Sequence, residues 1–307
     1  MSTLSRSVLR LAGEDTLRFL QTLTTQDVVA AFRPSQASAP LPVSLLLDDT
    51  ARGIVTDGAP RRHVLTAFLT PQGRMICDAV VTRDVDEANV FYVDTDSRSG
   101  DVLRKHLLRY KLRSPVDLAD VSAERAVVHH LPGVHGALPS AVVDPRTAAL
   151  GLRDVVSVDA APAHDDAALA AYHLARWHAG VPEGPEDMPR GDAVVHECNL
   201  VTLGAVSFKK GCYLGQELTA RTQHRGEVRK HLRPVALAGD VASLADLETL
   251  EMEAVQTDGD APTRRRRRAP GILRSIVAPG KGFALVRDDV DALTVSGVPV
   301  DVLRPYA

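Results

Sequence analysis

A single cysteine, Cys212, lies in a short segment whose residue types could carry chemistry, Lys210–Glu217 (KGCYLGQE). The run Gly215–Arg221 resembles the first turns of a helix, so we expect the sulfur at or just before a helix N-terminus. The positive end of the helix dipole and the preceding lysine side chains both favour the thiolate there. Gly211 permits a tight backbone approach and leaves the sulfur uncovered. This setting predicts a reactive or metal-binding cysteine.

The other two cysteines have different surroundings. Cys77 stands in an apolar run typical of a strand, and Cys198 lies between Glu197 and Asn199. A buried, inert thiol is the commonest state of a free cysteine, and we expect it for both. Three widely spaced cysteines without a CxxC pair do not match a zinc ribbon or a disulfide scaffold. They fit a reducing compartment.

One thiolate leaves two kinds of chemistry open. A cysteine hydrolase needs a base within hydrogen-bond reach, and His224 and His231 are available downstream. An iron–sulfur cluster needs about four ligands, and the chain has no cysteine cluster to supply them. If Cys212 binds iron, the other ligands must come from a partner or a small thiol, which indicates a transient or shared cluster.

The composition of the chain limits the function classes. Its 307 residues are 45% hydrophobic and 24% charged, which is ordinary for a globular protein of up to two domains. The net charge of −3 gives no support to nucleic-acid binding, and no apolar run approaches the ~20 residues of a membrane span. Arg6 and Arg10 make the N-terminus slightly basic, as in the remnant of an organelle presequence. An ordinary first strand is the better interpretation, because Val8–Leu11 alternates.

Hydrophobic periodicity predicts an α+β arrangement for the first part of the chain. The predicted helices cover residues 17–23, 102–110 and 167–179, the last one ended by Gly180 and Pro182. The predicted strands cover residues 64–69, 75–82 and 90–93, with a turn at 70–74 between the first two. Residues 33–44 and 182–191 are predicted to form loops.

The residue pattern of the sequence changes after His231. Short extended runs separated by turn residues predict a small β-barrel, with strands at 232–237, 272–277, 282–287 and 298–303. The predicted domains are therefore residues 1–230 and 231–307. The five arginines Arg264–Arg268 are interpreted as a solvated, mobile loop, and an anionic partner for them ranks second.

Residues 210–217 match the signature K-G-C-[FY]-x-G-Q-E, and the following LTAR extends the match. The sequence resembles the GcvT-like folate-binding-fold proteins, and among them the Iba57 (Caf17, YgfZ-like) iron–sulfur cluster assembly factors. It resembles the aminomethyltransferases more distantly. Further matching blocks occur in the expected order and extend the resemblance over most of the chain: Gly13–Asp15, Phe19–Gln21, Thr25–Asp27, Ala67–Arg74 with Asp78, His106–Arg113, Asp144–Arg146, Gly180–Gly184 and Glu197–Leu200.

This resemblance implies an α+β GcvT-like fold. Sheet-and-helix domains would form a ring around a central channel that accommodates tetrahydrofolate in relatives, followed by a C-terminal β-barrel. Glu197 stands where aminomethyltransferases have a glutamate that hydrogen-bonds the pterin, so it is a candidate folate contact, with a salt bridge or helix cap as the alternative. The catalytic aspartate of those enzymes has no secure match, although Asp78 is nearby. Tetrahydrofolate-dependent one-carbon transfer is therefore the alternative function.

The function that the resemblance implies is late iron–sulfur cluster assembly in the mitochondrial matrix, in [4Fe–4S] maturation, by a factor that is not primarily an enzyme. Cys212 would be a transfer thiol or a ligand of a [2Fe–2S] or [4Fe–4S] cluster shared with an A-type (Isca-like) carrier protein. Lys210 and Arg221 would poise or dock that site. Ferredoxin is a further candidate partner. No permanently bound cluster, nucleic-acid partner or membrane span is expected.

Overall fold

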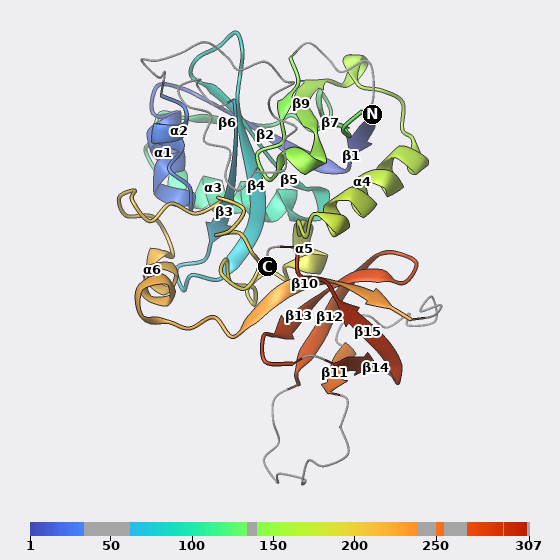
Figure 1. The fold of residues 1–307 in the computed structure, drawn as a ribbon. Coiled ribbons are helices and arrows are strands. Elements are labelled where there is room, and N and C mark those ends of the chain that lie inside the picture. The colour runs from blue at the N-terminus through green and yellow to red at the C-terminus, as the bar shows by residue number, and fades with distance from the viewer. Residues whose placement is uncertain (34–61, 134–139, 239–249, 255–268, 291, 306–307) are drawn as a thin grey trace.

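The computed structural model describes residues 1–33, 62–133, 140–238, 250–254, 269–290 and 292–305. Two antiparallel sheets with their helices lie above a closed barrel, which forms the lower part of the molecule in Figure 1. Most of the predicted loop 33–44 and the arginines Arg264–Arg268 lie outside the described residues. Among the described residues, no helix is long and apolar enough to cross a membrane.

The larger sheet has five strands in the order β3-β4-β5-β2-β6. Its strands are β2 (Arg6–Ala12), β3 (His63–Leu69), β4 (Met75–Arg83), β5 (Val90–Asp96) and β6 (Asp117–Asp120). All residues of β3 and β5 are buried, which is typical of strands covered on both faces. The predicted strands at 64–69, 75–82 and 90–93 are confirmed.

Three helices cover this sheet: α1 (Thr16–Leu23), α2 (Val28–Ala31) and α3 (Gly100–Lys111). The first buries Phe19, Leu20 and Leu23, and α3 buries Leu103 and Leu107, all in one apolar cluster. The predicted helices at 17–23 and 102–110 are confirmed. The short α2 was not predicted, because four residues are too few to show a helical period.

The second sheet has the order β1-β7-β9-β8 and is covered by α4. Its elements are β1 (Ser2–Leu4), β7 (Arg125–His130), β8 (Val142–Val143), β9 (Leu152–Ser157) and α4 (Asp166–His178). The predicted helix at 167–179 is confirmed, and Gly180 follows it with φ of 66°. The segment 182–191 is not all loop, because it contains the short helix α5 (Gly184–Asp187). Asp187 closes this turn by accepting a hydrogen bond from the Glu183 backbone N–H.

The barrel closes in the order β10-β13-β12-β11-β14-β15. Its strands are β10 (Lys230–Leu237), β11 (Leu250–Ala254), β12 (Gly271–Ala278), β13 (Lys281–Arg287), β14 (Leu293–Val295) and β15 (Val298–Val302). The four predicted barrel strands are confirmed, and β11 and β14 were missed. Trp177 of α4 donates its indole N–H to the carbonyl oxygens of Val235 and Gly282, which ties the barrel to the rest of the molecule.

Charged side chains are buried between the two sheets. Asp94 of β5 accepts from Arg6 of β2 at 2.8 Å and from Arg153 of β9 at 2.7 Å. Glu183 accepts from Arg146 and from the Tyr172 hydroxyl, each at 2.5 Å. Because buried charges must be paired, these contacts fix how the two sheets are placed relative to each other.

Candidate functional site

Cys212 lies in an irregular segment, four residues before Gln216, the first residue of α6 (Gln216–Arg225). Its side chain is exposed, whereas Cys77 and Cys198 are buried. Burial raises the pKa of each of the two buried thiols to about 12. The predicted burial of Cys77 and Cys198 and the predicted uncovered sulfur of Cys212 are confirmed. Among the described residues, no group of three or more His, Cys, Asp or Glu side chains could hold a metal ion.

Lys210, two residues before the cysteine, is buried rather than free. Its ammonium donates to the backbone carbonyl oxygens of Gln21 and Thr24 at 2.7 Å and of Gln26 at 2.9 Å. It also lies 4.9 Å from the centre of the Tyr213 ring. Burial lowers the pKa of Lys210 to about 8. All three N–H donors are used within the chain, so Lys210 positions the cysteine segment on the end of α1.

Neighbouring backbone contacts strengthen this attachment. The Thr25 hydroxyl donates to the Ala205 carbonyl at 2.7 Å, and the Ser207 N–H donates to the Thr25 carbonyl at 3.0 Å. The Leu214 N–H donates to the carbonyl of Thr22 at 3.0 Å. The block Thr25–Asp27, noticed in the sequence only through the resemblance, is therefore part of the support of the Cys212 segment.

Two turns that each contain a glycine contact one another next to this segment. Gly73, in the β3–β4 turn, and Gly215, at the start of α6, both have φ near +80°. A Cβ on Gly215 would lie 2.5 Å from the Thr70 carbonyl oxygen, and one on Gly73 would lie 2.6 Å from the Leu218 Cβ. Because neither turn leaves room for a side chain, the β3–β4 hairpin sets the position of the α6 N-terminus.

Gly211, adjacent to the cysteine, differs from these glycines. It has no positive φ, and a Cβ built on it would have no atom within 4 Å. The fold therefore does not require a glycine at this position. The tight backbone approach predicted for Gly211 is therefore absent, and Gly211 leaves open space at the residue that precedes the exposed Cys212.

Arg221 lies on α6 with its side chain exposed. It lies on an open stretch of the α6 surface together with Ala220, His224 and Arg225. The helical rise places His224 about 12 Å along the axis from the start of α6. The structure records no hydrogen bond between His224 and Cys212, and His231 bonds Asp288 at 2.9 Å. Neither histidine is thus placed as a base for Cys212, so the geometry gives a cysteine hydrolase no support.

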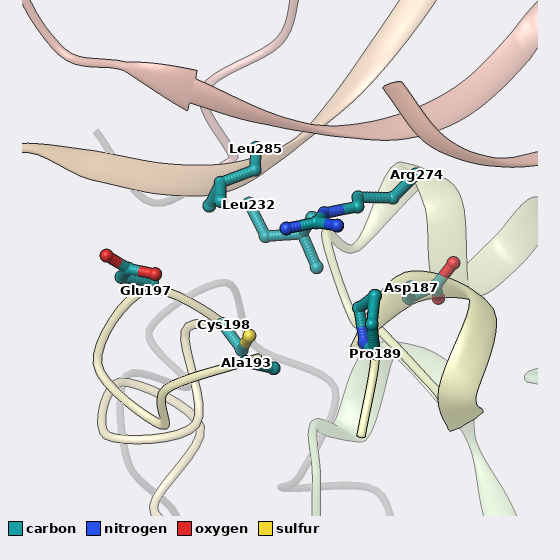
Figure 2. A pocket seen from close by; sticks show the side chains of 8 residues that line it. All are labelled: Asp187, Pro189, Ala193, Glu197, Cys198, Leu232, Arg274 and Leu285. Carbon is teal, nitrogen blue, oxygen red and sulfur yellow. The ribbon is translucent and has the colours of Figure 1, made fainter. Parts of the chain in front are cut away.

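Glu197 lies away from α6, beside the barrel. Figure 2 shows it with Cys198 on one side of a cavity whose other walls include Leu232 and Arg274 of the barrel. The Glu197 carboxylate is half-buried and lies 3.4 Å from the Lys230 ammonium. The cavity measures about 10 Å³, roughly the space that one water molecule needs. The residues around Glu197 therefore do not fit a pterin in this structure.

Asp78, the nearest match to a transferase aspartate, is buried in β4. Its carboxylate accepts from the Gly184 N–H at 3.0 Å and lies 4.0 Å from an Arg6 nitrogen. Burial raises the pKa of this carboxyl group above its ordinary value. Asp78 is held by the chain's own groups, and we derive no transfer step from it.

No family model matches the chain. A likeness of fold is found in the crystal structure of the glycine cleavage system aminomethyltransferase T from Bartonella henselae. It has a TM-score of 0.62 and 12% identity, covering 99% of this chain and 85% of that one. At this identity the likeness concerns the fold alone. The predicted GcvT-like α+β fold with a C-terminal β-barrel is confirmed.

Curated relatives give a closer comparison. The chain is 36% identical to "Iron-sulfur cluster assembly factor IBA57 homolog, mitochondrial" of Mycosarcoma maydis, covering 79% of this chain and 59% of the relative. It is 34% identical to the Mus musculus IBA57 protein (76% and 65%) and 35% identical to that of Homo sapiens (75% and 64%). The chain thus spans about three fifths to two thirds of these relatives' length. By these similarities the chain belongs to the IBA57 family of iron–sulfur cluster assembly factors.

Proposed function

We propose that the protein is an iron–sulfur cluster assembly factor of the mitochondrial matrix that acts late, in [4Fe–4S] maturation. The cluster is its cargo, and Cys212 is the thiol that holds or transfers it. The names of the relatives, which describe mitochondrial assembly factors, support the general role. The part played by Cys212 rests on its geometry in this chain.

The observation that carries this proposal is the exposure of Cys212 beside an open Gly211. A cluster is several ångströms wide, so its thiolate ligand must be accessible and free of neighbouring side chains. Cys77 and Cys198 meet neither condition, because both are buried. Burial also holds their thiols in the protonated form, which does not bind iron.

One thiolate fills one of about four ligand positions on a cluster. The remaining ligands would come from an A-type carrier protein, so the cluster is shared between two chains. Arg221 and Arg225 are exposed on α6, the helix that begins four residues after Cys212, and would give the docking partner a positively charged contact on that helix. Ferredoxin is a second candidate partner.

Anaerobic mixing with an A-type carrier loaded with a [2Fe–2S] cluster tests this function. We expect the wild-type protein to form a complex on size exclusion and to change the visible circular dichroism of the cluster. Cys212→Ala should lose both effects, while the matched Cys198→Ala variant, in which a buried thiol is removed, should keep them. If Cys212→Ala behaves like the wild type, its role as a ligand is refuted.

The alternative function, tetrahydrofolate-dependent one-carbon transfer, needs a pterin site, which the geometry around Glu197 does not offer. Calorimetric titration with tetrahydrofolate tests it directly. We expect no heat of binding up to millimolar ligand. Saturable binding that is lost in Glu197→Gln would instead support the transferase reading.

A further inference from the structure

The exposed face of α3 and its C-terminal turn form a concentrated patch of positive charge. Within ten residues it carries five cations and no acid, in a chain whose net charge is −3: Arg104, Lys105, Arg109, Lys111 and Arg113. The structure records no ion pair for any of the five, all of which it describes. The one acid of α3, Asp101, lies in the first turn, at the opposite end of the helix.

Two exposed leucines lie in the same stretch, Leu108 on α3 and Leu112 directly after its last residue. Leu108 is 44% exposed and Leu112 is 85% exposed, and they are two of the six large apolar side chains exposed among the described residues. At 100° per residue, Leu108 lies between Arg104 and Arg109 on the helix surface. Leu112 follows one turn later with φ of 45°, a conformation that a leucine seldom adopts. We call these two leucines and the five cations the basic leucine face.

The opposite side of α3 holds the basic leucine face rigidly. Leu103, His106 and Leu107 are buried there against the larger sheet, in the cluster that also contains Phe68. The helix therefore cannot turn Leu108 inward without breaking this core. The exposure of Leu108 is a fixed property of the folded protein.

We propose that the basic leucine face is a peripheral membrane-binding surface whose ligand is a bilayer of anionic phospholipid. The cations attract the lipid phosphates, and the long Lys and Arg stems let their charged ends stay among the headgroups. Leu108 and Leu112 enter the boundary between headgroups and acyl chains. A leucine side chain is more stable there than in water.

A protein partner fits this face less well. The cores of protein–protein interfaces are depleted of charged residues, especially lysine. Here each leucine has cations around it, so no uncharged core can form between them. A lipid surface has no such requirement, because its phosphates and its acyl chains lie in adjacent layers.

Cosedimentation of the full chain with vesicles tests this inference and does not depend on the role of Cys212. We expect binding to vesicles of two parts phosphatidylcholine and one part phosphatidylglycerol, little binding to pure phosphatidylcholine, and release at high salt. Reversing two charges, in Arg104→Glu with Arg109→Glu, should weaken binding at least about 25-fold, since each basic residue near such a surface contributes about fivefold. Equal binding to both kinds of vesicle would overturn the proposal.

Two further variants separate this surface from general electrostatic attraction. Arg190→Glu with Arg229→Glu makes the same change in net charge elsewhere and should bind like the wild type. Leu108→Ser with Leu112→Ser keeps every charge and should still lose most of the binding. The membrane assignment is wrong if the control variant weakens binding as much as the charge reversal on α3, or if the leucine variant binds as well as the wild type. An acidic macromolecule would then be the better ligand for the basic leucine face.

Discussion

Lys210 and Cys212 stand two residues apart in opposite environments. The lysine is 8% exposed and bonds three carbonyl groups, while the cysteine is exposed beside a glycine with open space around it. One side chain anchors the segment and the other presents its functional group. The lysine therefore serves the site by holding its position.

Replacing Lys210 by Met tests this role. The variant removes three hydrogen bonds to backbone carbonyl groups, so we expect the free energy of unfolding to fall by about 2–4 kcal/mol. Lys209→Met is the matched control, because Lys209 is exposed, and it should change stability by less than about 0.5 kcal/mol. Urea unfolding measures both, and equal effects of the two variants would contradict the anchoring role.

The exposure of Cys212 could be predicted because it depends on its immediate neighbours in sequence, Gly211 and the start of α6. The anchoring role of Lys210 could not be predicted in this way. Its hydrogen-bond partners lie 184 to 189 residues earlier in the chain, and nothing in the local pattern indicates them. The local sequence predicts that the charge of Lys210 supports the Cys212 thiolate, and this stays a prediction.

At the scale of elements, the β3–β4 turn and the start of α6 are fitted to each other through Gly73 and Gly215. Both glycines occur in blocks that the sequence resemblance had already marked. Only the structure shows that the two blocks touch. The hairpin is therefore part of the support of the Cys212 segment, although it carries no reactive group.

A pair of alanine variants isolates this contact. Gly215→Ala and Gly204→Ala both place a Cβ at positive φ, but only the first meets other atoms, since Gly204 has nothing within 4 Å. We expect Gly204→Ala to cost about 1 kcal/mol from backbone strain, and Gly215→Ala to cost about 1–3 kcal/mol more from overpacking. Chemical unfolding gives both values, and equal losses would show that the hairpin contact is not tight.

Long elements were predicted well and short ones poorly. The strands β3, β4 and β5 and the helices α1, α3 and α4 have seven or more residues, enough to show a period. In contrast, β8, β14 and α2 have four residues or fewer, too few to show a period. The barrel was predicted from four of its six strands, and its closure also requires β11 and β14.

At the scale of the whole molecule, several histidines are buried in the uncharged form. Burial lowers the pKa of His63 and His129 to about 3, and burial with the nearby Arg109 lowers that of His106 to about 4. The ordinary value in an unfolded chain is about 6.5. Between these values the unfolded state binds protons that the folded state does not, so acid favours unfolding.

We therefore expect the free energy of unfolding to change little between about pH 7 and 7.5 and to fall as the pH drops below about 6.5. Each buried histidine contributes a slope of up to about 1.4 kcal/mol per pH unit. Unfolding by urea at pH 7.5 and at pH 5.5 measures the change. His106→Phe keeps a ring beside Phe68 and should show a shallower dependence on pH, whereas an unchanged slope would exclude His106 as a source.

The hydrogen bonds of Lys210 also have a consequence for folding order. They join chain segments 184 or more residues apart, and contacts of such long range form slowly because a large loop must close first. During synthesis or import, α1 emerges long before Lys210. Until the chain has been completed past this point, Cys212 has no fixed position, so the thiol takes up a defined place only in a protein that has already folded around it.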